Sequence, residues 1–292
     1  MKRRLILFLS VLVLLAGIGI MLYPTVSTLV NNRTQSEVIT GYREEVSRFS
    51  EEELEALWAA AGAYNERLRS SAIVLTDPFS EEAAEVVSED YYELLNIDGD
   101  GVMGYLDIPE IGVHLSIYHG TSQEVLAKGV GHLEGTSLPS GGAGTHSVLS
   151  AHTGLSKKLF DDLTKLREGD TFSVTLLDET LTYEVYETET VTPDNVSSLG
   201  IQGGKDLVTL VTCTPRGVNT HRLLVHGTRV PTPEEPEAAP TPALQAVNLS
   251  WEYLAIGGAV ILLALLVLIL GIRRGRKRRR RIQMLWRQIR KS

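Results

Sequence analysis

Cys213 is the only cysteine of the chain, and its thiol is the strongest nucleophile that the sequence offers. It ends the apolar run 207–213, and Arg222 begins a second apolar run nine residues later. A turn-forming sequence joins the two runs, which are therefore predicted to be neighbouring antiparallel strands. Such a pair places the end of one strand beside the start of the next, so Cys213 and Arg222 should lie together at one rim of a sheet. A thiol beside a fixed cation is typical of cysteine-dependent acyl-transfer enzymes.

A cysteine nucleophile also needs a base or an imidazolium partner within hydrogen-bond reach. His152 follows the apolar run 147–151 and precedes Thr-Gly, which places it where a strand gives way to a loop. His226 is the alternative, because Arg222, Leu224 and His226 alternate onto one face of their strand. We favour His152 and expect structural or surface roles for the other five histidines, at positions 114, 119, 132, 146 and 221.

Two uncharged apolar stretches flank the middle of the chain. Residues 5–22 and 254–272 are each long enough to cross a bilayer as a helix. Basic residues lie in the short tail 1–4 and in the tail 273–292, and such flanks stay on the cytoplasmic side. We therefore predict a two-pass protein of the cell membrane, with both termini in the cytoplasm and the middle outside the cell. A cleaved signal peptide is the alternative for the first stretch, although no clear small-x-small cleavage site follows it.

The net charge of −8 hides a strongly acidic middle region. Of the 28 lysines and arginines, 14 lie in the two tails and 14 in the middle region. All 36 acidic residues lie in the middle region, which therefore carries a net charge of −22. Nucleic-acid binding requires a basic face, so we exclude it for this region. The basic C-terminal tail beside an apolar stretch is expected to contact anionic membrane lipid. One cysteine allows no internal disulfide, and a free thiol kept outside the cell favours a functional role.

The middle region begins with helical segments, and we assign residues 37–99 to an N-terminal helical region. Apolar residues recur at three- and four-residue steps over 37–69, and the capping-box pattern at 50–53 predicts a break between two helices. A Thr-Asp-Pro-Phe-Ser sequence at 76–80 ends this pattern, and a further short helix is expected over 81–95.

From residue 100 onward the pattern is one of short strands. The predicted strands are 102–108, 113–118, 147–152, 171–177, 181–188, 207–213 and 221–230, with helical interruptions near 122–128 and 157–166. Many short strands separated by turn signals indicate a closed β-barrel or a sandwich. Residues 100–230 are therefore predicted to form one mainly β domain, and the proline-rich residues 231–250 an extended linker.

One pattern is similar to a calcium-binding loop. Asn96, Asp98, Asp100, Gly101 and Asp107 fall at positions 1, 3, 5, 6 and 12 of an EF-hand-like loop, but the twelfth ligand would be Asp in place of Glu. A strand also follows in place of a helix, and the same residues make a good turn sequence. We therefore predict no metal site and no cofactor.

Five separated motifs resemble, in order, those of the class C sortases, which polymerise pilins. They are residues 106–110, 117–120, 129–139, 144–154 and the Thr-Leu-x-Thr-Cys signature at 209–213 with Arg222 after it. The resemblance implies an eight-stranded sortase barrel in which Cys213 is the nucleophile, His152 the general acid/base and Arg222 the stabiliser of substrate and oxyanion. Thr153 and Arg216 stand where many relatives show arginine and tyrosine, so the resemblance leaves fine substrate preference open.

The resemblance further implies a transpeptidation. Cys213 would attack the Thr–Gly bond of an LPXTG-like sorting signal on a secreted pilin, and a lysine amine of another pilin subunit would resolve the thioacyl-enzyme into an isopeptide. The thioester divides one difficult exchange into two easier steps. The alternatives are a housekeeping sortase that anchors surface proteins to Gram-positive peptidoglycan, a cysteine protease, and a silent assembly scaffold, which the intact Cys213, His152 and Arg222 disfavour.

Class C sortases also carry a lid over the active site, and Asp77-Pro78-Phe79 resembles its Asp-Pro-aromatic motif. The resemblance implies that Asp77 pairs with Arg222 and that Phe79 covers Cys213. Apart from the resemblance, an ordinary helix-capping turn is the simpler interpretation. We expect the pair to lie near the surface and to contribute about 0–1 kcal/mol.

Overall fold

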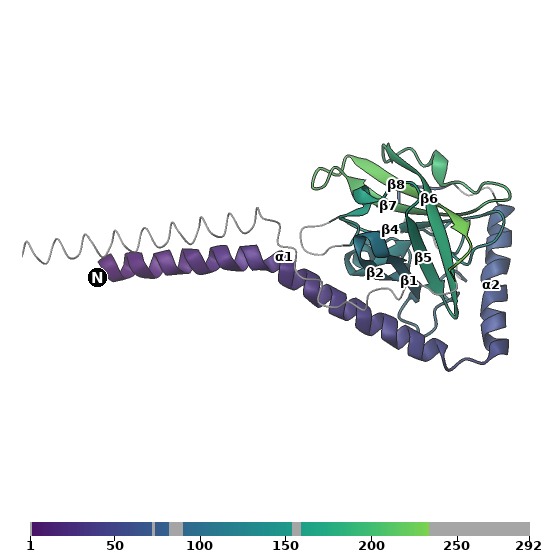
Figure 1. Ribbon diagram of the computed structural model, residues 1–292, viewed down its shortest axis with the longest axis horizontal. Coiled ribbons are helices and arrows are strands. Elements are labelled where there is room, and N and C mark those ends of the chain that lie inside the picture. The colour runs from purple at the N-terminus through teal and green to yellow at the C-terminus, as the bar shows by residue number, and fades with distance from the viewer. Residues whose placement is uncertain (1, 72–73, 82–89, 154–158, 234–292) are drawn as a thin grey trace, which may run out of the picture. The chain divides into compact units, whose positions relative to one another are not determined.

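The computed structural model describes residues 2–71, 74–81, 90–153 and 159–233 (Figure 1). Contacts divide the chain into two compact units; among the described residues, 2–27 belong to the first unit and 28–233 to the second. The barrel and the candidate site belong to the second unit.

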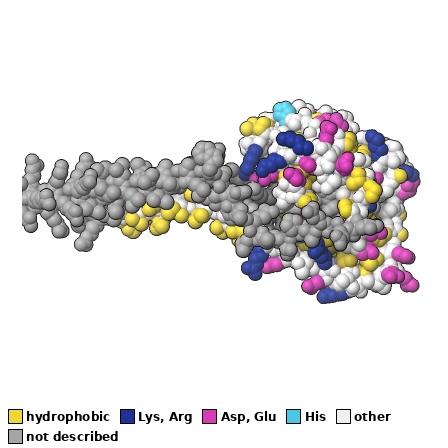
Figure 2. Space-filling model, viewed as in Figure 1, with side chains coloured by type: hydrophobic (Ala, Val, Ile, Leu, Met, Phe, Trp, Pro, Cys, Tyr) yellow, Lys and Arg dark blue, Asp and Glu magenta, His cyan; other side chains and the backbone are white. Residues whose placement is uncertain are grey.

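Helix α1 (Lys2–Val46) contains the first predicted membrane span. By length and composition, its stretch from Val11 to Val46 includes a segment able to cross a membrane, and hydrophobic side chains are exposed along it (Figure 2). The helix is continuous, so the residues between the predicted anchor and the predicted helical region are helical too. The predicted second span at 254–272, the basic tail after it and most of the linker lie outside the described residues.

Helix α2 (Glu51–Arg69) begins where the capping box predicted a break. The Ser50 side chain accepts a hydrogen bond from the Glu53 backbone, and the Glu53 carboxylate accepts one from the Ser50 backbone. The side chain of Asn65 then holds α2 against the barrel, since it donates to the Leu138 carbonyl at 3.1 Å and accepts from the Leu138 amide at 2.7 Å.

Eight strands among the described residues form a closed barrel in the order β1-β2-β3-β4-β7-β8-β6-β5. They are β1 (Val102–Ile108), β2 (Val113–His119), β3 (Val130–His132), β4 (Thr145–Ser150), β5 (Thr171–Leu176), β6 (Glu179–Val191), β7 (Asp206–Thr214) and β8 (His221–Val230). β2–β3 and β4–β7 pair in parallel, and the other neighbours pair antiparallel. The barrel is therefore confirmed, and seven of its strands match predicted runs. β3 was not predicted, because a three-residue strand shows no recognisable period.

Of the three helices predicted after residue 80, one is confirmed and two differ from the structure in their described parts. Helix α3 (Gln123–Lys128) is confirmed. The helix expected near 157–166 is wrong in its described part, where a single 3-10 turn (Leu163–Lys165) lies between bends and turns. Residues 90–95, at the end of the helix expected over 81–95, form turns, and residues 82–89 lie outside the described part of the chain.

Side chains along each strand alternate between the barrel interior and its outer surface. On β7, Leu210 belongs to the large interior core, whereas Val211 belongs to a second, smaller apolar cluster. This outer cluster consists of Leu133, Val148, Val191, Leu199, Val211 and Leu224, with Leu75, Phe79 and Val196 packed against it. We call the surface of β4, β7 and β8 that carries this cluster the outer face.

Candidate active site

Three neighbouring strands bring His152, Cys213 and Arg222 to one end of the outer face. Cys213 and Arg222 are directly opposite each other in the antiparallel β7–β8 pair. On the other side of β7, Ser150 of the parallel strand β4 lies opposite Val211, so the chain reaches His152 level with Cys213 two residues later. Neighbouring strands are about 4.8 Å apart. The three side chains therefore form a row across which one substrate bond can lie.

His152 lies two residues beyond the end of β4, at the change from strand to loop where the sequence placed it, although the predicted strand 147–152 extended too far. Two hydrogen bonds hold this part of the chain against β7, one from Thr212 Oγ1 to the Ala151 carbonyl at 2.7 Å and one from Thr153 Oγ1 to the Cys213 carbonyl at 3.3 Å. His152 Nε2 lies 3.2 Å from Gln123 Oε1. Sequence reasoning did not single out Gln123, because only the fold brings α3 to this histidine.

Asp77 occupies one edge of the Arg222 guanidinium. Its carboxylate accepts hydrogen bonds from Nε at 2.8 Å and from Nη2 at 2.6 Å. The two side chains are only 13% and 11% exposed, so the expectation of a surface pair is wrong. Charged hydrogen bonds with little exposure to water are stronger than surface ion pairs. The other edge of Arg222 is held by backbone, since Nη1 donates to the carbonyls of Asn219 and His221 at 3.1 Å each.

Phe79 lies over the same row of residues. The centre of the Phe79 ring lies 5.5 Å from the centre of the His152 ring. It also lies 5.1 Å from the guanidinium carbon of Arg222. Pro78 is buried, and Asp77 also accepts a turn hydrogen bond from the Ser80 amide through its carbonyl. The segment is thus both a compact turn and a cover that spans the row.

Burial shifts the pKa values of Cys213 and His152 in opposite directions. Burial raises the pKa of the Cys213 thiol, Arg222 opposes this rise, and Asp77 adds to it. Burial also lowers the pKa of His152. Cys213 as a whole residue is only 7% exposed. Under the Asp77–Phe79 cover, the site therefore favours a neutral thiol beside a neutral imidazole.

The structure does not bring His226 to Cys213. His226 lies four residues along β8 from Arg222, which is about 13 Å. Its ring is 2% exposed, with Nδ1 2.8 Å from Thr209 Oγ1 and Nε2 3.1 Å from Glu189 Oε1. These contacts are those of a buried structural histidine.

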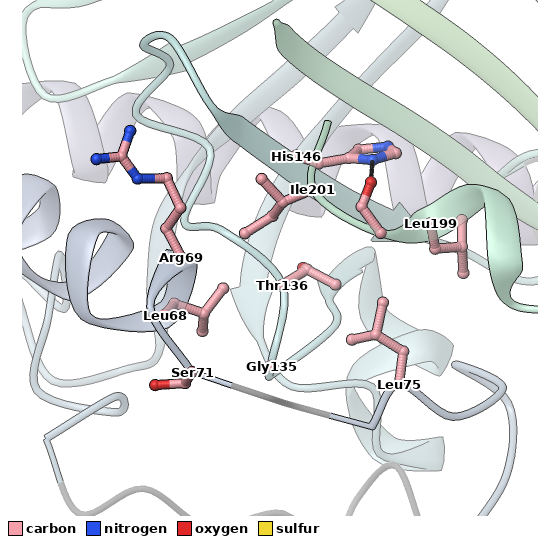
Figure 3. A pocket seen from close by; sticks show the side chains of 10 residues that line it. Leu68, Arg69, Ser71, Leu75, Gly135, Thr136, His146, Leu199 and Ile201 are labelled. Carbon is pink, nitrogen blue, oxygen red and sulfur yellow. Dashed lines mark hydrogen bonds between the residues drawn. The ribbon is translucent and has the colours of Figure 1, made fainter. Parts of the chain in front are cut away.

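A pocket of about 250 Å³ lies beside the outer face, next to the start of β4 (Figure 3). Leu68 and Leu75 line it from the N-terminal region, and Leu199 lines it from the β6–β7 loop. His146 lies at its wall and shares a hydrogen bond of 2.8 Å with the Gly200 carbonyl. Leu199 is a member of the outer cluster and Leu75 packs against it, so the pocket adjoins the outer face that carries Cys213.

Among the described residues, no group of three or more His, Cys, Asp or Glu side chains is arranged to hold a metal ion. In the loop that is similar to a calcium site, Asn96 Oδ1 accepts from the Gly101 amide and Asp100 Oδ1 accepts from the Val102 amide. These side chains close a turn.

A family model described as the sortase domain matches residues 106–230. Among curated proteins, sortase A of Streptococcus agalactiae is 33% identical over 129 residues, which are 43% of this chain and 51% of that protein. Sortase D of Bacillus subtilis is 33% identical over 130 residues, which are 44% of this chain and 63% of that protein. The chain thus spans between half and two thirds of the length of these curated relatives.

Solved structures of class C sortases resemble the chain over a larger share. Sortase C-1 of Streptococcus pneumoniae is 43% identical with a TM-score of 0.63, covering 68% of this chain and 100% of that one. Sortase C1 of S. agalactiae is 46% identical with a TM-score of 0.62 and the same coverage. Sortase C-1 of Actinomyces oris is 47% identical with a TM-score of 0.57, covering 61% of this chain and 99% of that one. The chain therefore belongs to the sortase family of cysteine transpeptidases, and these structures relate it to the class C sortases.

Proposed function

We propose that this protein is a membrane-anchored transpeptidase that polymerises pilins. It cleaves an LPXTG-like sorting signal of a secreted pilin between Thr and Gly and transfers the acyl group to a lysine of another pilin subunit. The observation that carries the proposal is the row of His152, Cys213 and Arg222 beneath the Asp77–Phe79 cover. Similar solved structures include a sortase C of Streptococcus pneumoniae described with its pilin substrate specificity and a pilus-related sortase C of group B Streptococcus, and this favours a pilin acceptor over peptidoglycan.

The row supplies each group that the reaction requires. Cys213 passes its thiol proton to His152, its Sγ attacks the threonine carbonyl carbon, and Arg222 stabilises the oxyanion that forms. His152 donates a proton to the glycine amine as the C–N bond breaks, which leaves a thioester on Cys213. The lysine amine then attacks the thioester, His152 takes its proton, and Sγ departs. In comparable sites one oxyanion donor contributes about 10²–10³ in rate and a general acid/base about 10²–10⁴.

Removal of the cover prepares the site for this chemistry. When Asp77 leaves, Nε and Nη2 of Arg222 become available to the substrate, while Nη1 stays on the backbone carbonyls of Asn219 and His221. The carboxylate that adds to the raised pKa of Cys213 departs at the same time. Both changes favour a thiolate next to a free guanidinium.

The outer cluster offers a floor for the apolar part of the sorting signal. Val211 precedes Cys213 by two residues on the same face of β7. Leu224 lies opposite Val211 on β8, and Val148 of β4 belongs to the same cluster. In the covered state Leu75 and Phe79 pack on this floor. An extended peptide advances about 3.3 Å per residue. With its threonine at Cys213, its leucine and proline therefore lie over the floor.

The test uses purified pilin and the full-length enzyme in detergent. Wild-type protein should form covalent pilin ladders, and Cys213→Ala should form none. Ladders from the Cys213→Ala variant would contradict the mechanism. Transfer to a peptidoglycan stem-peptide amine, with none to pilin lysine, would identify a housekeeping sortase instead.

A further inference from the structure

An ion pair joins the two loops that leave the row of site residues. Arg216 lies three residues after Cys213 in the β7–β8 loop, and its Nη2 is 2.9 Å from Oδ2 of Asp161. Asp161 belongs to the segment that follows His152. The Asp161 side chain is 3% exposed and that of Arg216 is 51% exposed. A guanidinium at the surface thus meets a buried carboxylate, unlike an ordinary surface pair, in which both groups keep their water.

The Asp161 end of the pair is fixed to the backbone of the histidine. The Phe160 amide donates a hydrogen bond to the His152 carbonyl at 3.2 Å. Phe160 and Leu163, on either side of Asp161, are fully buried in the large core. Asp161 is therefore a rigid point, and whatever it holds is positioned relative to His152.

The Arg216 end of the pair belongs to a compact turn that reaches Arg222. The Pro215 carbonyl accepts from the amides of Val218 and Asn219 at 3.0 and 2.9 Å, which closes the turn around Arg216. The Asn219 carbonyl in turn accepts from Arg222 Nη1 at 3.1 Å. The position of this turn therefore helps to set where the Arg222 guanidinium lies.

We propose that Arg216 and Asp161 form a positioning latch, which fixes the β7–β8 turn against the segment after His152 and so holds Arg222 in register with Cys213 and His152. The latch matters most when the cover is open. Arg222 then loses both hydrogen bonds to Asp77, while its hydrogen bonds to the carbonyls of Asn219 and His221 remain. Its catalytic consequence rests on the proposed function, whereas its effect on the geometry of the row does not.

The first test needs no substrate. In full-length protein carrying Asp77→Ala and Phe79→Ala, the labelling rate of Cys213 by a small thiol reagent is measured against pH, with and without Arg216→Ala. Arg222 lowers the pKa of Cys213, so a guanidinium that drifts away should move the labelling midpoint to higher pH. The matched control is Arg67→Ala, which removes the arginine of an exposed ion pair between α2 and Asp90, whose side chains are 59% and 60% exposed. Equal midpoints for the Arg216 and Arg67 variants would overturn the latch.

The second test measures the single-turnover rate of acyl-enzyme formation from a sorting peptide, at a temperature where circular dichroism shows every variant folded. Misplacement of a catalytic group by about 1 Å costs up to about 100-fold, and we expect losses of about 10- to 100-fold for Arg216→Ala and for Asp161→Asn. The double variant should be no slower than the slower single variant, and Arg216→Lys should recover part of the rate. Losses that multiply in the double variant would show independent roles and overturn the latch. A shifted labelling midpoint in a protein that forms no acyl-enzyme would support the latch and refute the proposed function.

Discussion

Removing the cover should expose and activate Cys213. The double variant Asp77→Ala, Phe79→Ala loses two charge-assisted hydrogen bonds to Arg222 and the apolar contact of one ring. The hydrogen-bonded charges contribute about 1.5–3 kcal/mol. The half-buried Phe79 contributes about 1 kcal/mol, since full burial of such a side chain contributes about 1.5–3 kcal/mol. Since about 1.4 kcal/mol is a factor of ten, the wild-type cover should be open for about 10⁻² to 10⁻³ of the time.

The assay is the labelling rate of Cys213 with a small thiol reagent, in full-length protein at one pH. If labelling requires opening, the double variant should react about 100- to 1,000-fold faster than wild type. Val74→Ala is the control, since Val74 belongs to the same segment and is 83% exposed. It should label at the wild-type rate.

The pH dependence separates access from ionisation. Asp77 adds to the raised pKa of Cys213, so without it the thiolate should form at lower pH and the labelling midpoint should fall. Far above both midpoints the thiol is ionised in both proteins, and any remaining difference reports access alone. Equal rates for wild type and double variant throughout would show that residues 77–79 form only a capping turn, and the reasoning would be refuted.

Three further outcomes are expected. His152→Ala should reduce the transpeptidation rate by about 10²–10⁴. His226→Ala should lower the unfolding free energy by about 1–3 kcal/mol, because buried hydrogen bonds are lost, and should keep most activity below its melting temperature. A folded but inactive His226→Ala variant beside an active His152→Ala variant would reverse these roles. Arg222→Lys keeps the charge but loses the planar fork that Asp77 and the backbone hold, so its acyl-enzyme formation should fall at least tenfold, and an unchanged rate would remove Arg222 from the mechanism. Ser50→Ala removes the cap of α2 and should cost about 1 kcal/mol in a denaturant titration, with turnover unchanged at low temperature.

Local patterns were sufficient for the pairing of Cys213 and Arg222. The two residues are nine positions apart in a hairpin, and a hairpin is encoded by two apolar runs and a turn. The bounds of β1 and β8 followed from the same kind of pattern. The helix expected near 157–166 failed because its apolar residues insert into the core from a series of turns, at a spacing that resembles a helix.

Long-range contacts were beyond the local pattern. His152 lies level with Cys213 only through the parallel pairing of β4 with β7, and its place at a strand end favoured it over His226 without predicting that pairing. Asp77 and Arg222 are 145 positions apart, and the depth of their burial depends on packing that no spacing encodes. Gln123 beside His152, the pocket, and the pair of Arg216 with Asp161 carried no signal in the sequence for the same reason.

One measurement tests the proposed mechanism most directly. The full-length double variant Asp77→Ala, Phe79→Ala is incubated with an LPXTG-like peptide without an acceptor amine, and mass spectrometry then measures the protein and its Cys213-containing fragment. We expect an adduct on Cys213 equal to the acyl portion that ends at threonine, with release of the fragment that begins at glycine. A pilin lysine should then discharge the adduct. The same variant carrying Cys213→Ala should acquire no adduct. If the folded double variant reacts rapidly with a small thiol reagent at Cys213 yet never carries this acyl group, Cys213 is not the nucleophile of a sortase reaction.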